Sequence, residues 1–97
     1  MTRYLVTSAL PYANGPIHFG HIAGAYLPAD VYVRYLKMAK GEENVLYVCG
    51  TDEHGVAITM KAEAEGSNYR DYVDKWHKEI GDLFNSFAIN FDIFSGT

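Results

Sequence analysis

The sequence predicts an α/β fold in which a mostly parallel sheet is built in the order β-α-β-α-α-β. Three short apolar runs, at residues 4–10, 44–50 and 90–96, have the length and composition of strands. The longer stretches between them have helical periodicity or a helix-forming composition. Alternation of this kind favours right-handed connections and a doubly wound sheet, of which this chain is expected to be the first half.

The first helical segment, from Gly20 to Gly41, contains a proline in its interior. Pro28 removes a backbone donor and disfavours helical angles at Leu27. The sequence therefore predicts a short first helix, a break near Leu27 and a second helix with Pro28 in its first turn. Gly41 is expected to end that helix in the left-handed conformation.

The remaining elements are predicted from their apolar patterns. The run at residues 44–50 is almost continuously apolar, which is typical of a strand covered on both faces. A helix is predicted from Val56 to a closing Gly66, and a longer one follows it. The longer helix has one apolar stripe, made of Tyr69, Tyr72, Val73, Trp76, Ile80, Leu83, Phe84 and Phe87. His77 falls on its charged side, where the pattern assigns it no role.

Composition limits the class of protein. The chain has 97 residues, a formal net charge of -4 and no clustered basic face of the kind that binds nucleic acid. Cys49 is its single cysteine, so neither an internal disulfide nor a CxxC zinc pair is predicted. The N-terminus does not resemble a signal peptide, and no apolar run approaches the roughly 20 residues of a membrane helix. We expect a cytoplasmic protein with no membrane partner.

Two strand ends carry the polar residues that could form a site. The first strand leads into "ALPYANGPIHFGH" and the second into "GTDEHG". Ligands of open α/β sheets bind outside the carboxyl ends of the strands. If the two strands are parallel, then His18, His21 and Asp52 converge on one crevice, although about thirty residues separate them.

This crevice has features that suit a nucleotide. A helix that begins near Gly20 or His21 would direct free N–H groups and a positive dipole end towards it. Imidazole N–H groups would add donors for the charge that develops at a reacting phosphorus. Gly20 would let a flat base approach the backbone, and Tyr12 could form a wall of the pocket.

Other interpretations of these residues remain open. A His-x-x-His pair can bind metal, but a site needs three or four ligands, and Cys49, Asp52, Glu53 and His54 are the remaining candidates. We therefore predict no metal site. The histidines could also be ordinary polar loop residues. Asp52 could cap the helix that follows it, or it could bind a ligand's ammonium group or ribose hydroxyl.

The motifs together resemble a known family. "PYANGPIHFGH" resembles the His-Ile-Gly-His signature of class I aminoacyl-tRNA synthetases, with Phe19 at the variable second position. "ALPYANG", "GTDEHG" and the closing "FDIFSGT" are similar to the methionyl-tRNA synthetase family in particular, so that the resemblance extends along nearly the whole chain. It implies a Rossmann-like nucleotide-binding fold of the type found in HIGH-motif nucleotidyltransferases.

The resemblance also implies an activity and a set of site residues. Methionine would react with ATP, supplied with Mg²⁺, to give methionyl-adenylate and pyrophosphate, and would then pass to tRNA(Met). Matching positions make His18 and His21 catalytic. The ATP-binding residues would be Asn14, His18, Gly20 and His21. The methionine-binding residues would be Ala9, Leu10, Tyr12 and Asp52, with the Asp52 carboxylate holding the methionine ammonium.

Several parts of the family are missing from these residues. The second catalytic motif, Lys-Met-Ser-Lys-Ser, should lie far downstream; "KMAK" at Lys37 to Lys40 is too close to His21, and we expect its lysines to be solvated and Met38 to pack inward. The family's zinc knuckle and tRNA-binding domain are also missing. Residues 1–97 are therefore expected to be an incomplete N-terminal part of the catalytic domain.

Such a piece is expected to bind its substrates weakly and to be nearly inactive alone. A complementary C-terminal chain, or self-association of the truncated sheet, could cover its open side. Two other functions stay open at this point. The chain could belong to a nucleotidyltransferase with a His-x-Gly-His site and another substrate, or it could be a non-catalytic interaction module.

Overall fold

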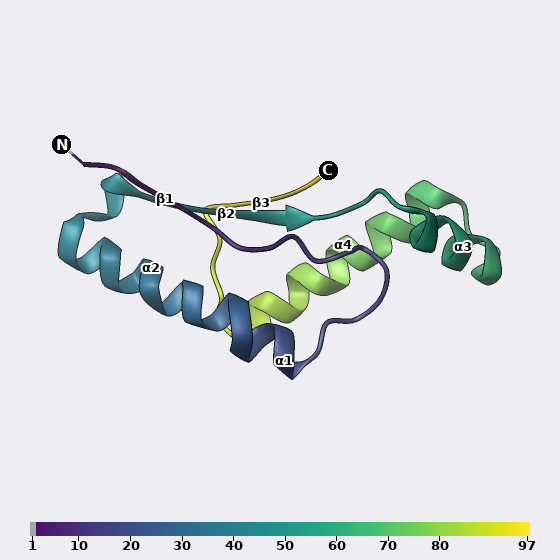
Figure 1. Cartoon of the computed structure of the whole chain (residues 1–97), viewed down its shortest axis with the longest axis horizontal. Coiled ribbons are helices and arrows are strands. Elements are labelled where there is room, and N and C mark those ends of the chain that lie inside the picture. The colour runs from purple at the N-terminus through teal and green to yellow at the C-terminus, as the bar shows by residue number, and fades with distance from the viewer. Residues whose placement is uncertain (1) are drawn as a thin grey trace.

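Three parallel strands form a sheet in the order β1-β2-β3, in a computed structural model that describes residues 2–97 (Figure 1). The parallel α/β class and the predicted order of elements are confirmed. The strands are β1 at Tyr4–Thr7, β2 at Val45–Thr51 and β3 at Ile93–Gly96.

β2 is the central strand. β1 pairs with it from Tyr4 opposite Val45 to Thr7 opposite Val48. β3 pairs with its other edge, from Val48 opposite Ile93 onwards. The carboxyl ends of all three strands therefore lie at the same edge of the sheet.

β1 is shorter than the predicted strand, which ran to Leu10. Its regular pairing ends at Thr7 and resumes at one isolated bridge between Tyr12 and Asp52. Tyr12 lies five residues after Thr7. Its bridge partner Asp52 lies only four residues after Val48, the partner of Thr7. Residues 8–11 therefore lie outside the ladder, with one more residue on this side than on the β2 side.

The helical segment after β1 is continuous, and the predicted break near Leu27 is wrong. α1 (Phe19–His21), a π-helical turn η1 (Ile22–Tyr26) and α2 (Leu27–Lys40) follow one another without interruption. Leu27 keeps helical angles and donates its N–H to Ile22 O, five residues back. The wider π turn accommodates the Pro28 ring and its missing donor.

The other helices begin and end close to the predicted residues. Gly41 ends α2 with φ 94°, but its ψ of 133° is extended, so the expected left-handed helical cap is wrong in detail. A short 3₁₀ turn, η2 (Glu42–Asn44), leads into β2. α3 (Val56–Glu65) is closed by Gly66 in the left-handed conformation, as predicted. α4 (Tyr69–Ser86) carries the apolar stripe.

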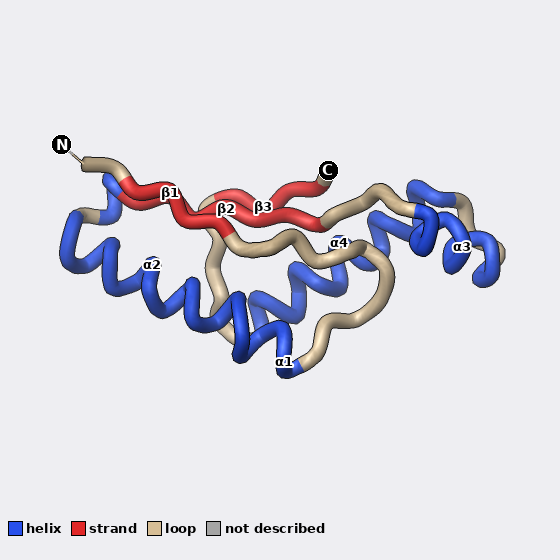
Figure 2. Tube along the Cα trace, in the orientation of Figure 1, coloured by secondary structure: helices blue, strands red, loops and turns tan. Residues whose placement is uncertain are grey.

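α2 and α4 lie on the same face of the sheet (Figures 1 and 2). The apolar core between the sheet and these helices includes Tyr47 of β2, Leu36 of α2 and Phe84 of α4. On the opposite face Leu5 and Leu46 are exposed. The prediction that the central strand is covered on both faces is therefore wrong for the described residues.

The "KMAK" segment lies at the end of α2, and its residues differ from the prediction. Lys37 is not solvated: its Nζ lies 2.9 Å from Asp92 Oδ1. Asp92 also accepts the N–H of Tyr47 at 2.7 Å, which links α2 to β2 and to the segment before β3. Met38 does not pack inward but is 82% exposed, because residues 33 and 36 occupy the buried side of the helix.

Among residues 2–97 no helix is both long enough and apolar enough to cross a membrane.

Candidate functional site

A cleft of about 360 Å³ lies between the loop after β1 and the start of the first helix. Its wall combines apolar and polar groups. Ala9, Leu10, Tyr12, Asn14 and His21 line it, together with Tyr26 of the π turn. Five of the predicted site residues therefore share one cleft, whereas His18, Gly20 and Asp52 are not among its lining residues.

The loops that follow β1 and β2 are joined beside this cleft. Tyr12 and Asp52 form a parallel bridge. The Asp52 N–H donates to Pro11 O at 2.8 Å, and the Ala13 N–H donates to Asp52 O at 2.9 Å. Asp52 is not itself a lining residue of the cleft, but its backbone is held against the residues that are. The two loops therefore meet at this pair, but of the three residues predicted to converge on one crevice, His18, His21 and Asp52, only His21 lines the cleft.

The two histidines contact each other at the start of α1. Their rings stack with centroids 3.9 Å apart and an angle of 29° between the planes. His18 Nδ1 accepts the Gly20 N–H at 3.0 Å, and His21 Nδ1 accepts the His18 N–H at 3.1 Å. This reciprocal arrangement is a capping box made from two imidazoles. The expectation of free N–H groups at this helix start is wrong for Gly20, because the His18 side chain already accepts its N–H.

The capping bonds determine what the rings can offer to a ligand. A neutral imidazole has one N–H donor and one acceptor nitrogen. Because Nδ1 of each ring accepts a backbone N–H, the proton of each neutral ring is on Nε2. His18 and His21 therefore each keep one N–H donor available. Two neighbouring donors of this kind suit the oxygens of a phosphate group.

Gly20 has a reason to be glycine that the sequence did not suggest. A Cβ at this position would lie 2.7 Å from His18 Cε1 and 2.9 Å from His18 Nδ1. Any side chain on Gly20 would therefore displace the capping imidazole. The absence of a side chain serves the placement of His18, whether or not a nucleotide base also approaches this backbone.

Asp52 does not cap the helix that follows it. Its Oδ1 accepts the N–H of His54 at 3.3 Å, within the loop. α3 begins two residues later at Val56, and its N-cap residue Gly55 makes no side-chain capping bond. The carboxylate is half-buried at the edge where the strands end, so it remains placed to accept a bond from a ligand.

Comparisons with known proteins identify the family. The sequence family described as tRNA synthetases class I (M) matches residues 4–97. The chain belongs to this family. The resemblance that the motifs indicated is therefore confirmed.

Individual relatives are similar over the same residues. The methionine–tRNA ligase of Rubrobacter xylanophilus is 63% identical over 95 residues, which are 98% of this chain and 16% of the relative. That of Thermococcus kodakarensis is 61% identical over 97 residues, 100% of this chain and 13% of the relative. The chain thus spans about a sixth or less of the length of these relatives.

A solved structure has the same fold. The Mycobacterium tuberculosis methionyl-tRNA synthetase in complex with methionyl-adenylate superposes with a TM-score of 0.89 and 29% sequence identity. The match covers 97% of this chain and 18% of that one. A second structure of the same enzyme, bound by methionyl-adenylate, gives a TM-score of 0.86 at 26% identity. The Rossmann-like fold expected for the class I synthetase family is confirmed.

The sequence did not indicate Tyr26 as a site residue of this class I synthetase segment. Its side chain is buried, lines the cleft and donates its hydroxyl to Ala9 O at 2.6 Å. Burial raises the pKa of Tyr26 to about 12, and the neighbouring Cys49 and Tyr47 add to the effect. Tyr26 ends the π turn that precedes Pro28, where a helix break was predicted, so no pattern in the sequence pointed to this residue.

His77 also has contacts that the pattern of α4 did not predict. Its Nδ1 lies 2.7 Å from Thr51 Oγ1 of β2, and its ring stacks on Phe94 with centroids 4.8 Å apart. The expectation that His77 sits among solvated charges without a partner is wrong. α4 passes close enough to the carboxyl end of β2 for residue 77 to reach the strand.

The described residues offer no set of side chains that could bind a metal ion. Residues 2–97 contain no group of three or more His, Cys, Asp or Glu side chains that could hold an ion. Of the four residues considered as further ligands, Glu53 binds Arg70 and Thr51 instead, with distances of 2.7 Å and 2.8 Å. Cys49 is buried, and burial raises the pKa of its thiol, which disfavours the thiolate that binds metals.

Proposed function

We propose that this chain is the N-terminal part of the catalytic domain of a methionyl-tRNA synthetase, and that it takes part in methionine activation. The observation that carries the proposal is the cleft itself. It unites the capping histidine His21 with the loop that is bridged to Asp52. The relatives' names and the adenylate bound to the similar Mycobacterium tuberculosis enzyme support the same reaction.

The proposed reaction has two steps. A carboxylate oxygen of methionine attacks the α-phosphorus of ATP, the bond from that phosphorus to the β-phosphate bridging oxygen breaks, and pyrophosphate leaves. A hydroxyl at the tRNA(Met) 3′ end then attacks the carbonyl carbon of methionyl-adenylate, and AMP leaves. The protein needs no nucleophile of its own for either step, since positioning and charge stabilisation provide the catalysis.

His18 and His21 act on the ATP side. Each ring keeps its Nε2–H free because a backbone N–H occupies its Nδ1. These donors would bind phosphate oxygens and stabilise the charge that grows during displacement at the α-phosphorus. Asn14 lines the same cleft and Gly20 lies between the histidines in the chain, which supports their assignment to the nucleotide side. Magnesium would arrive as part of the ATP substrate.

The methionine side lies at the end of β1. Ala9, Leu10 and Tyr12 offer a largely apolar wall to the thioether side chain. Asp52, bridged to Tyr12, would accept the ammonium group, which fixes the orientation of the carboxylate relative to ATP.

The rest of the enzyme would have to supply the second catalytic motif, the contacts to tRNA and any zinc knuckle. The exposed Leu5, Leu46 and Ile93 on the open face of the sheet support its contact with such a further segment, since parallel sheets are normally covered on both faces. We place the activity in the cytoplasm, where tRNA is charged. The 97 residues alone are expected to bind substrates weakly.

The test uses a completed enzyme, defined as a chimaera in which residues 4–97 replace the matching segment of the Rubrobacter xylanophilus methionine–tRNA ligase. We expect ATP–pyrophosphate exchange that requires methionine and is not supported by leucine, isoleucine or valine. His21→Ala in the same chimaera is the control for activity that comes from the site. A folded chimaera without methionine-dependent exchange would refute the proposal, and exchange dependent on another acid would favour a different nucleotidyltransferase.

A further inference from the structure

The residues on both sides of Asp52 have buried side chains. Thr51 is 0% exposed and Glu53 is 6% exposed, although Glu53 is an acidic residue at the edge of the sheet. Side chains alternate between the two faces of an extended strand. Thr51 and Glu53, two residues apart, therefore share the buried side that faces α4, where His77 and Arg70 contact them.

A chain of hydrogen bonds connects these two residues to α4. Thr51 Oγ1 donates to Glu53 Oε2 at 2.8 Å and lies 2.7 Å from His77 Nδ1. A hydroxyl has only one proton to donate, so His77 must be the donor to Thr51 through its Nδ1–H. Arg70 Nη2 donates to the other oxygen, Glu53 Oε1, at 2.7 Å. Glu53 Oε1 is thus bonded directly to Arg70 of α4. Glu53 Oε2 is bonded to Thr51, which is itself bonded to His77 of α4.

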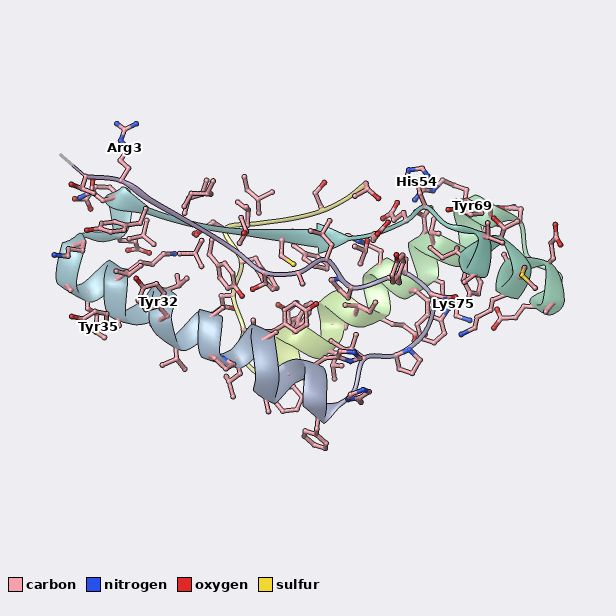
Figure 3. The ribbon with its side chains drawn as sticks, in the orientation of Figure 1. Arg3, Tyr32, Tyr35, His54, Tyr69 and Lys75 are labelled. Atoms are coloured by element: carbon pink, nitrogen blue, oxygen red, sulfur yellow. The ribbon has the colours of Figure 1, made fainter. Side chains whose placement is uncertain are left out.

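The backbone around Asp52 is fixed from the same side. The Tyr69 hydroxyl at the start of α4 donates to Glu53 O, and Figure 3 shows Tyr69 at the same end of the molecule as the neighbouring His54. The Glu53 N–H donates to Thr97 Oγ1 at 2.8 Å, and the Thr97 N–H donates to Thr51 O at 3.0 Å. The peptide groups adjoining Asp52 are therefore tied to both α4 and the segment after β3.

We propose that Thr51, Glu53, Arg70 and His77 are positioning residues that hold the Asp52 carboxylate where it receives the ammonium group of the amino acid. This inference rests on the proposed function, because it uses Asp52 as the ammonium-binding group. None of the four touches substrate. They act by holding the β2–α3 loop in one conformation. Binding is then not opposed by the conformational entropy that a mobile loop would lose on becoming ordered.

The geometry of the contacts makes each residue specific for this task. A valine at position 51 would fill the same volume as threonine but would break the bonds to both Glu53 and His77. A Cβ on Gly96 would collide with the Glu53 carboxylate, so β3 too is shaped to admit this buried group. An acidic group needed only for solubility would have no reason to be buried in this way.

The experiment compares Thr51→Val with Thr51→Ser in the completed enzyme. Serine keeps the hydroxyl, so Thr51→Ser should behave as the unmodified enzyme does. Thr51→Val should raise the KM for methionine about tenfold, as expected for losing a hydrogen bond to a charged group. The KM for ATP should change less than about twofold, since the histidines lie on the other loop. Equal KM values for methionine in the two variants would overturn the proposal, as would equal rises in both KM values.

A second pair of variants keeps the proposal testable if Thr51→Val does not fold. His77→Phe retains the stacking on Phe94 but has no donor for Thr51, whereas His77→Asn places an amide where Nδ1 was. We expect His77→Phe to raise the KM for methionine and His77→Asn to restore it towards the original value. Failure of His77→Phe to raise it in a folded enzyme would contradict the positioning role.

A double variant separates this proposal from the proposed function. In an Asp52→Asn background, Thr51→Val should cause no further rise in the KM for methionine, because the group that it positions is already gone. An additive rise would show a general structural effect and would overturn the positioning role alone. If Asp52→Asn by itself leaves the KM for methionine unchanged, both the ammonium-binding role of Asp52 and the positioning proposal are wrong.

Discussion

The ring of His18 occupies the space into which a side chain on Gly20 would project. His18 Nδ1 accepts the Gly20 N–H at 3.0 Å, and a Cβ on residue 20 would lie 2.7 Å from His18 Cε1. The signature glycine and the signature histidine are thus linked by a local steric requirement. A side chain on residue 20 would have to displace this ring from its present position.

Gly20→Ala is expected to be less stable than a matched glycine-to-alanine change in the same helix, and to slow adenylate formation. The Cβ would push the His18 ring out of its capping position, which costs about 1 kcal/mol, the usual value of a lost N-cap bond. Because alanine also favours the helix, this cost should appear in urea titrations as a free energy of unfolding about 1 kcal/mol lower for Gly20→Ala than for Gly24→Ala. Exchange activity in the completed enzyme should fall with it, because the ring stacked on His21 has moved.

Gly24→Ala is the matched control for this substitution. Gly24 lies in the π turn, four residues further along the same helix, and a Cβ there would meet nothing within 4 Å. Since alanine is the better helix former, this variant should be unchanged or more stable by about 0.5–1 kcal/mol. Equal losses of stability at positions 20 and 24 would contradict the steric link between Gly20 and His18.

Tyr26→Phe is expected to cost about 1 kcal/mol of stability at neutral pH, because it removes the hydroxyl that donates to Ala9 O. Burial raises the pKa of Tyr26 from its ordinary 10.0 to about 12. A raised pKa means that the stabilising contribution is fully present below pH 10.0 and is lost as the pH rises towards 12. By pH ~11 this tyrosine alone should lower the free energy of unfolding by roughly 1 kcal/mol.

Urea titrations near neutrality and near the upper end of this pH range test the assignment. Tyr26→Phe should lose less stability than the original chain over that range. A residual loss should remain, since burial also raises the pKa of Tyr47. Tyr35→Phe should leave the free energy of unfolding unchanged, because Tyr35 is exposed on the outer side of α2 (Figure 3). An identical alkaline loss in the original chain and in Tyr26→Phe would contradict the role of Tyr26.

Lys37→Ala and Lys40→Ala are expected to differ, although both residues belong to "KMAK". Lys37 binds Asp92, and the loss of this partly buried pair should cost on the order of 0.5–1 kcal/mol. Burial raises the pKa of Asp92, but the Tyr47 N–H and Lys37 outweigh it and keep the pKa below 3.8. The contribution of Asp92 is therefore present above pH 3.8 and is lost as the pH falls below it.

The acid dependence of the two variants gives the readout. Lys37→Ala should lose less stability on acidification than the original chain does, because the pKa of Asp92 is lowered less when Lys37 is absent. Lys40 lies in the last turn of α2 and is exposed, so Lys40→Ala should retain the full acid dependence. A Lys40→Ala variant as unstable as Lys37→Ala would show that the loss of a positive charge near the C-terminus of α2, not the ion pair, is responsible.

The sequence was sufficient for the sheet and for the meeting of the two loops. Apolar runs predicted the strands, and the βαβ order favoured a parallel sheet, so the loops after the first two strands were expected at one edge, where Tyr12 and Asp52 now form a bridge. The break at Leu27 was predicted wrongly for a physical reason. Pro28 forbids an ordinary α-helical bond, but a π turn satisfies the same restriction without interrupting the helix.

The supporting contacts of the site could not be predicted, because they depend on tertiary distance. Nothing in the pattern of α4 shows that His77 reaches β2 or that Arg70 reaches the loop after it, since both occur among the charged residues of an amphipathic helix. The capping role of His18 was missed for another reason. Histidine is an uncommon N-cap residue, and its ring reaches the Gly20 N–H only because that residue is glycine.

Steady-state exchange kinetics of Asp52→Asn and His21→Ala, side by side in the completed enzyme, test the assembled site most directly. The two substitutions are expected to change different kinetic constants. Asp52→Asn should raise the KM for methionine and leave that for ATP nearly unchanged. His21→Ala should lower kcat by about 100-fold or more, a barrier increase on the order of 3 kcal/mol, with little change in either KM. Indistinguishable kinetic defects in the two folded variants would contradict an active site formed where these two loops meet.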